Sequence, residues 1–174
     1  MFLRASFALA VILIPSLATA AATNPSGLPL PRFVTIKSKE SNVRVGPGYQ
    51  YDVAWKYQVG GVPVEIIQEF DVWRKIRDVD GSEGWVHQNM LSGGRAGYVL
   101  QDAGPQVGLR ASAGDTAGVV AWVGPGFPVS IRSCDGNWCS VTAVDHPTDG
   151  RLANYQGYLP EAELWGVYKG ESFD

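Results

Sequence analysis

Aromatic side chains are the residues of this sequence whose type and spacing best suit molecular recognition. Tyrosine and tryptophan rings offer a large contact area with little loss of rotamer entropy, and each keeps a polar edge for hydrogen bonding. Such rings line grooves that bind extended peptides. We therefore take the following aromatic residues as a candidate ligand-binding groove: Tyr49, Tyr51, Trp55, Tyr57, Trp73 and Trp85.

The alternative is that these rings fill a hydrophobic core, and strand alternation separates the two roles. Neighbouring side chains of a strand point to opposite faces of the sheet. Trp73 and Ile76 lie an odd number of residues apart, so Trp73 faces outward if Ile76 belongs to the core. Trp85 and Val86 are adjacent, so Trp85 likewise faces outward if Val86 belongs to the core. The pattern predicts that Tyr51, Trp73 and Trp85 share an exposed surface.

The two cysteines, Cys134 and Cys139, lie close together in the sequence and indicate a disulfide. An even number of cysteines at short spacing is typical of disulfide-bonded proteins in an oxidising compartment. The alternative is a zinc site that also uses His146, but one histidine and this cysteine spacing make a poor tetrahedral site. We therefore expect a disulfide, no bound metal and no cofactor.

No arrangement of side chains in the sequence indicates catalysis. A catalytic site of this kind needs a nucleophile and a base, and the only histidines are His87 and His146. Both cysteines fall on one predicted hairpin, so the Cys–His arrangement of a cell-wall peptidase is not expected. Paired carboxylates such as Glu161 and Glu163 fall in exposed segments, where solvation is the simpler interpretation. The sequence therefore predicts a protein that is not an enzyme.

An internal repeat with a spacing of about 65 residues organises the chain around these side chains. Both copies contain the same ordered blocks: 42–44 and 108–110, 52–55 and 119–122, 61–66 and 126–131, 73–76 and 138–141, 83–87 and 156–160. By this offset Cys134 falls on Glu69 and Cys139 on Arg74. A disulfide in one copy and an opposite-charge pair in the other would then clamp the same hairpin.

Each block is a short run of strand-forming residues bounded by Gly, Pro, Asn or Asp, which is the pattern of a β-strand. The Asp80-Gly81 dipeptide is a strong hairpin-turn signal between two such runs. Several strands in each copy and no helical stretch predict an all-β fold with two small barrels. We expect residues 98–100 to form the last strand of the first barrel.

Four blocks of the first copy resemble the bacterial Src homology 3 family: Asn-Val-Arg-Val-Gly-Pro-Gly (42–48), Pro-Val-Glu-Ile (63–66), Trp-Arg-Lys-Ile-Arg-Asp (73–78) and Gly-Trp-Val-His (84–87). The second copy keeps the order of the blocks in weaker form. The resemblance implies two tandem SH3-like β-barrels, at residues 32–102 and, in divergent form, 103–174. It also implies modules of exported bacterial proteins that target the cell wall or bind peptides.

Arg44 and Arg110 occupy the same place in both copies. Their recurrence indicates a structural role, such as tying the following loop to a backbone carbonyl or a carboxylate. Gly46 and Gly48, on either side of a proline, predict a tight turn, because proline fixes φ and glycine permits positive φ.

The first 22 residues are typical of a secretory signal peptide. A single charge precedes an apolar run at residues 7–14, and small residues follow at 18–22. This run is shorter than the roughly 20 residues that span a bilayer, so we expect cleavage rather than a membrane anchor. Residues 23–31 would then be an N-terminal extension of an exported protein, periplasmic or secreted, with no membrane span in the mature chain.

Charge argues against nucleic acid as a partner. Residues 32–95 carry 9 basic and 8 acidic side chains, whereas residues 96–174 carry 4 basic and 9 acidic ones. Neither half has the concentrated positive field that nucleic-acid binding requires.

Together these features predict a binding module of the cell envelope, whose first barrel presents the aromatic groove to a peptide such as the peptidoglycan stem peptide. The alternative is a structural adaptor, in which the two barrels dock on each other or on an envelope protein and bury the aromatic residues at that interface.

Overall fold

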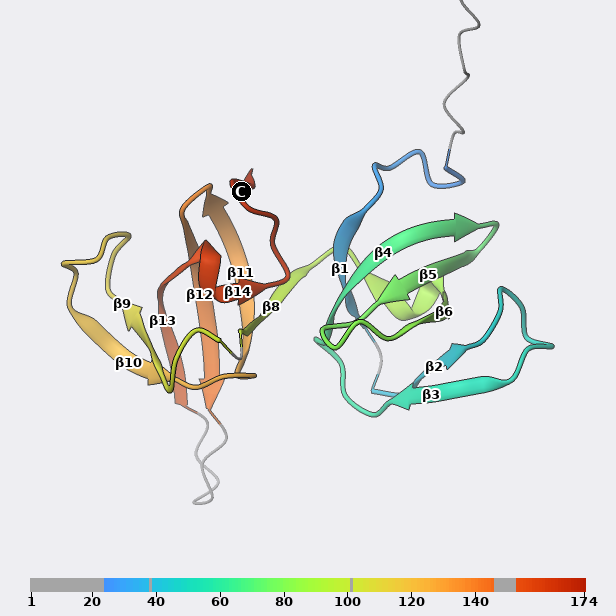
Figure 1. Ribbon diagram of the computed structural model, residues 1–174, viewed down its shortest axis with the longest axis horizontal. Helices are drawn as coiled ribbons and strands as arrows, with labels where there is room; N and C mark the ends of the chain where they lie inside the picture. Colours follow the sequence, from blue (N-terminus) through green and yellow to red (C-terminus); the bar gives the residue numbers. More distant parts are fainter. Residues whose placement is uncertain (1–23, 38, 101, 146–152) are drawn as a thin grey trace, which may run out of the picture.

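The computed structural model describes residues 24–37, 39–100, 102–145 and 153–174, which form two β-sheets (Figure 1). The expected signal peptide and His146 lie outside the described residues. Within the described ranges, no helix has the length and apolar character needed to cross a membrane.

The first sheet is seven-stranded and is made by the first copy of the repeat. In chain order its strands are β1 (Arg32–Ile36), β2 (Ser41–Arg44), β3 (Val53–Tyr57), β4 (Pro63–Phe70), β5 (Trp73–Arg77), β6 (Glu83–His87) and β7 (Leu91–Ser92). A 3₁₀ turn, η1 (Gln88–Met90), joins β6 to β7. The strands lie in the order β3-β2-β6-β5-β4-β1-β7, and neighbouring strands are antiparallel.

The second sheet repeats this arrangement. Its strands are β8 (Arg95–Val99), β9 (Val107–Arg110), β10 (Val119–Val123), β11 (Pro128–Asp135), β12 (Trp138–Asp145), β13 (Ala153–Pro160) and β14 (Leu164–Trp165), with η2 (Glu161–Glu163) before β14. A short strand, β15 (Ser172–Phe173), pairs with β11. The order β10-β9-β13-β12-β11-β8-β14 matches the first sheet strand for strand. The structure thus confirms an all-β fold of two equivalent units.

Strand β8 corrects one expectation, because residues 98–100 do not close the first barrel. β8 pairs with β11 and β14, and it has the position in the second sheet that β1 has in the first. The second hydrogen-bonded unit therefore begins at β8 and not at residue 103. The apolar side chains of this strand contact both cores: Val99 lies in the second core, and Tyr98 packs against the first.

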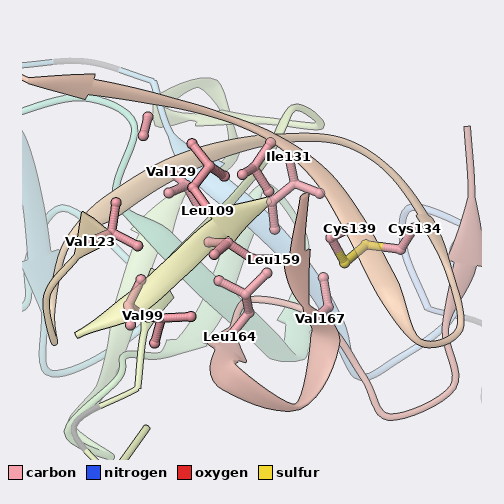
Figure 2. Close-up of a cluster of buried hydrophobic side chains, with 13 residues drawn as sticks. Val99, Leu109, Val123, Val129, Ile131, Cys134, Cys139, Leu159, Leu164 and Val167 are labelled. Carbon is pink, nitrogen blue, oxygen red and sulfur yellow. A yellow bond between two sulfur atoms is a disulfide. The ribbon is translucent and has the colours of Figure 1, made fainter. Parts of the chain in front are cut away.

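Each barrel has its own core of aliphatic side chains. In the first, Ile36, Val43, Ile66, Ile76 and Val86 are at most 2% exposed. The second is built the same way and contains Val99, Val107, Leu109, Val123, Val129, Ile131, Val141, Ala143, Leu159, Leu164 and Val167, with Cys134 and Cys139 at one end (Figure 2).

The glycine of the Gly-Trp-Val block allows two strands to approach closely. A Cβ on Gly84 would collide with the core side chain of Val43 on β2. In the second barrel, a Cβ on Gly157 would lie 2.8 Å from Leu109 Cγ. Both contacts are shorter than normal packing distances, which explains why glycine occupies this place in both copies.

Candidate functional site

The loop that follows β2 is held in place by Arg44. Its Nη1 donates hydrogen bonds to the carbonyl oxygens of Tyr51 (2.7 Å) and Tyr49 (3.3 Å). In the second barrel Arg110 Nη1 donates to the carbonyl oxygen of Ala117 (2.9 Å). The loop-tying hydrogen bonds that the recurrence of arginine predicts are therefore present in both copies.

The predicted turn around Pro47 is present, but its glycines have another role than the expected one. Gly48 N donates to the carbonyl of Gly46 (3.0 Å), and Tyr51 N donates to the carbonyl of Gly48 (3.3 Å). Neither glycine is among the described residues with positive φ. Gly46 is needed for space instead, because a Cβ there would overlap the ring of Tyr51.

Tyr49, Trp73 and His87 form a compact ring cluster on the outer face of the first barrel. The ring centroid of Tyr49 lies 5.1 Å from that of Trp73, at an interplanar angle of 74°, and 5.9 Å from that of His87, at 24°. Trp73 and His87 are cross-strand partners on β5 and β6, with ring centroids 5.5 Å apart. The Arg44 guanidinium lies 5.6 Å from the Tyr49 ring centroid, within range of a cation–π contact.

The tryptophans of the candidate groove face away from the core, as alternation predicts, but they are not exposed. Ile76 and Val86 belong to the first core, whereas Trp73 and Trp85 do not. Trp73 is nevertheless only 6% exposed and Trp85 only 9%. The expectation that Trp73 and Trp85 lie on a shared exposed surface is therefore wrong. Trp73 is covered by Tyr49, which is 70% exposed.

The remaining aromatic residues of the candidate groove lie elsewhere. Trp55 and Tyr57 pack against the first core in an edge-to-face pair with centroids 6.4 Å apart. The Tyr57 hydroxyl donates to Asp78 Oδ2 (2.8 Å), and burial together with this carboxylate raises the pKa of Tyr57. Tyr51 is 40% exposed and lies against Gly46. Among the described residues, the predicted set is thus divided into two separate ring pairs, Tyr49 with Trp73 and Trp55 with Tyr57, and does not form one groove.

A cavity of about 240 Å³ adjoins this ring cluster, and we call it the Tyr49 cavity. Its lining contains aromatic rings, one acidic and one basic side chain, an amide and a methionine: Glu40, Asn42, Arg44, Tyr49, Trp73, His87 and Met90. His87 Nδ1 accepts a hydrogen bond from Asn89 N (3.2 Å), so Nε2 is the ring nitrogen that can donate a hydrogen bond into the cavity. Sequence reasoning missed His87 as a lining residue, although its cross-strand pairing with Trp73 was a usable signal.

The hairpin of each barrel is clamped as the repeat offset predicts. Cys134 and Cys139 form a disulfide and are cross-strand partners on β11 and β12. Glu69 and Arg74 are cross-strand partners at the same place on β4 and β5. Their ion pair, Glu69 Oε1 to Arg74 Nε, spans 3.2 Å.

Glu69 is the centre of a larger polar cluster that includes the N-terminal extension. Its carboxylate accepts hydrogen bonds from Ser26 N (2.9 Å), Ser26 Oγ (2.7 Å) and Arg32 Nη2 (2.5 Å). Burial alone would raise the pKa of Glu69, but the hydrogen bonds from Arg32 and Ser26 outweigh it and lower the pKa. Glu69 is therefore ionised at neutral pH.

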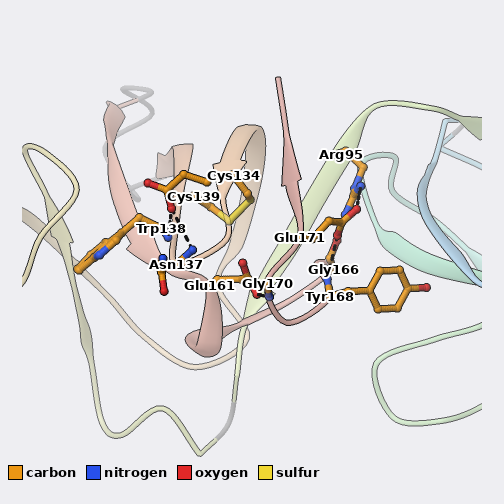
Figure 3. Close-up of a disulfide and its surroundings, with 11 residues drawn as sticks. Arg95, Cys134, Asn137, Trp138, Cys139, Glu161, Gly166, Tyr168, Gly170 and Glu171 are labelled. Atoms are coloured by element: carbon orange, nitrogen blue, oxygen red, sulfur yellow. Dashed lines mark hydrogen bonds and ion pairs between the residues drawn. A yellow bond between two sulfur atoms is a disulfide. The ribbon is translucent and has the colours of Figure 1, made fainter.

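The two barrels contact each other through a different set of aromatic residues. The Phe33 ring lies 5.0 Å from Trp165 and 4.8 Å from Tyr168, measured between centroids. The Tyr168 hydroxyl donates to Glu65 Oε1 (2.7 Å), which joins the second barrel to the first. Arg95, which pairs with Glu171 of its own barrel at 2.8 Å (Figure 3), also places its guanidinium 5.9 Å from the Phe33 ring centroid. None of the candidate groove aromatics takes part in these described contacts.

The chain is similar to two solved structures and matches one family model. No curated protein matches the chain significantly. Among solved structures, it is similar to NlpC2 from Trichomonas vaginalis, with 11% identity and a TM-score of 0.32 over 78% of this chain and 48% of that one. It is also similar to NlpC1 from Trichomonas vaginalis, with 13% identity and a TM-score of 0.31 over 88% and 50%.

The chain therefore spans about half the length of these two structures. The family model described as "Bacterial SH3 domain" matches residues 37–93 and again residues 103–166, one match in each copy of the repeat. The chain belongs to the bacterial SH3 domain family, with two domains in tandem.

Proposed function

We propose that this protein is a non-enzymatic binding module of the bacterial cell envelope and that its first barrel binds a short peptide in the Tyr49 cavity. Membership of a family of binding domains supports a binding role. One observation carries the choice of site, namely that the exposed Tyr49 ring lies over the buried Trp73 beside both a carboxylate and a guanidinium.

The size of the Tyr49 cavity favours part of a peptide over a complete small molecule. Its volume of about 240 Å³ lies below the range of about 300–1,000 Å³ that is typical of small-molecule sites. One or two residues of an extended chain fit such a space. The rest of the peptide would lie along the surface, where it gains less from burial.

The lining chemistry favours a peptide that carries both charges. Arg44 and the Nε2–H of His87 are donors suited to a carboxylate. Glu40 is an acceptor suited to an amide N–H or an ammonium group. The peptidoglycan stem peptide has free carboxylates, amide groups and small apolar side chains, so it is the ligand class that we propose.

The proposal is tested by titrating the protein with soluble peptidoglycan stem peptides while tryptophan fluorescence is recorded, because Trp73 lines the cavity. Tyr49→Ala should weaken a saturable fluorescence change by at least about tenfold, the range of a truncated aromatic contact. Tyr155→Ala is the matched control, since Tyr155 is an exposed tyrosine of the second barrel. No response to any stem peptide, or equal losses in the two variants, would contradict the proposal.

The structural adaptor remains a second candidate, and the contact between the barrels favours it. Phe33 is only 8% exposed because Trp165 and Tyr168 cover it, so the two barrels are joined through buried aromatic area. Such a contact would hold the pair in one orientation for a protein partner. If the protein is an adaptor, Tyr49→Ala should leave its binding to an envelope protein unchanged. If it is a peptide-binding module, Tyr49→Ala should weaken its binding to the peptide.

A further inference from the structure

A second cavity lies beside the disulfide hairpin of the second barrel, with a volume of about 440 Å³. Its lining comes from the hairpin turn, η2 and the C-terminal segment: Gly136, Asn137, Glu161, Ala162, Leu164, Val167 and Lys169. We call it the Glu161 cavity. Figure 3 shows Glu161 between the hairpin turn and Gly170.

Glu161 is a buried acid with one unmatched oxygen. The residue is 5% exposed, and its Oε1 accepts a hydrogen bond from Gly170 N. Its Oε2 is buried and has no hydrogen-bond partner among the described residues. Lys169 also lines the cavity, but its side chain is exposed. A buried carboxylate oxygen is strongly favoured to accept a hydrogen bond, above all from a cation.

The first barrel shows which group fits this position. Gln88 is the counterpart of Glu161, because each begins the 3₁₀ turn and each donates its backbone N–H to the hairpin: Gln88 to the Val72 carbonyl (2.9 Å) and Glu161 to the Asn137 carbonyl (2.8 Å). Gln88 Oε1 accepts a hydrogen bond of 2.7 Å from Arg74 Nη2. A guanidinium group therefore occupies this place in the first barrel.

The same guanidinium is held by the hairpin turn. Arg74 Nη1 donates to the carbonyl oxygens of Asp71 (2.7 Å) and Trp73 (3.0 Å). By the repeat offset, these residues correspond to Gly136 and Trp138 in the second barrel.

The second barrel keeps a side-chain acceptor, Glu161, and the hairpin turn at the corresponding positions, but it does not keep the arginine. The counterpart of Arg74 is Cys139, which is bound in the disulfide. A glutamate also replaces Gln88 at this place.

We propose that the Glu161 cavity binds the guanidinium group of an arginine side chain from a partner peptide, in the place that Arg74 has in the first barrel. Leu164 and Val167 would contact the methylene stem of that side chain. The surrounding charge agrees, because residues 96–174 carry 4 basic and 9 acidic side chains and such a field attracts cationic partners. This site lies on the other barrel from the Tyr49 cavity and does not depend on it.

The test is an NMR titration of the ¹⁵N-labelled full chain with the peptide acetyl-Gly-Arg-Gly-amide. The backbone amides of Gly170 and Asn137 should shift in a saturable manner. The same peptide with citrulline, a neutral isostere of arginine, should bind at least about tenfold more weakly, the effect of losing a charged hydrogen bond. Equal responses to the two peptides, or no saturable shift, would overturn the proposal.

A pair of variants locates the binding within the barrel. Glu161→Gln, which recreates the amide of the first barrel, should weaken binding of the arginine peptide by about tenfold. Glu163→Gln is the matched control, because it makes the same substitution in the same turn, and Glu163 does not line the Glu161 cavity. Unchanged binding by Glu161→Gln would refute the site. If that variant does not fold, the arginine and citrulline peptides still decide the question on the unaltered chain.

Discussion

Replacing Glu69 by glutamine tests whether the polar cluster of the first hairpin stabilises that barrel. The side chain of Glu69 is fully buried and that of Arg74 is 6% exposed. Removing the charge of Glu69 therefore leaves the Arg74 guanidinium buried without its ion-pair partner. Removing one member of a buried ion pair costs about 3–5 kcal/mol. Arg74 keeps hydrogen bonds to Asp71, Trp73 and Gln88, which limits the loss. We therefore expect Glu69→Gln to lower the free energy of unfolding by about 2–3 kcal/mol.

The assay is thermal unfolding followed by circular dichroism. For a domain of this size, a loss of 2–3 kcal/mol corresponds to a fall in Tm of about 10 °C or more. Glu83→Gln is the control, because Glu83 pairs with Lys75 and Arg77 at the surface, where ion pairs contribute little. An unchanged Tm for Glu69→Gln, or equal shifts in the two variants, would refute the reasoning.

The pH dependence of the same comparison gives an independent check. The pKa of Glu69 is lowered in the folded state, because hydrogen bonds from Arg32 and Ser26 outweigh the opposing effect of burial. Ionised Glu69 therefore contributes its full stability above the ordinary glutamate pKa and loses it as the pH falls through the lowered pKa. The difference in stability between the unaltered protein and Glu69→Gln should be constant near neutral pH and shrink below about pH 4.

Two further variants, one double and one single, probe the second barrel and the contact between the barrels. Replacing Cys134 and Cys139 together by alanine should cost about 2 kcal/mol or less, because the disulfide closes a very short loop; a loss above about 4 kcal/mol in urea unfolding would show that the disulfide has a larger role. Tyr168→Phe removes the hydrogen bond to Glu65 and should cost about 1 kcal/mol by the same assay, so an unaltered midpoint would argue against that contact.

The repeat predicted the register of both hairpins correctly, and the reason is local. A β-hairpin with a short turn fixes which residues face each other, so one offset carries Glu69 and Arg74 onto Cys134 and Cys139. The direction of Trp73 followed from the same alternation. These features depend on residues within a single hairpin, and a sequence pattern can report them.

The features that sequence reasoning missed depend on segments far apart in the chain. Trp73 is buried because the loop of Tyr49 folds back over it, and no alternation within β5 contains that information. The residues of β8 were assigned to the wrong barrel because their apolar side chains face one core on each side. The bond from Tyr168 to Glu65 joins residues 103 positions apart, and no local pattern predicts it.

The Tyr49 cavity is tested most directly by mapping where a stem peptide binds. In an NMR titration with a soluble peptidoglycan stem peptide, we expect saturable shifts at Asn42, Tyr49 and His87 and at the indole N–H of Trp73, which all line that cavity. Residues of the second barrel should not shift. Saturable shifts confined to the second barrel, or none in either barrel, would contradict the proposed binding site.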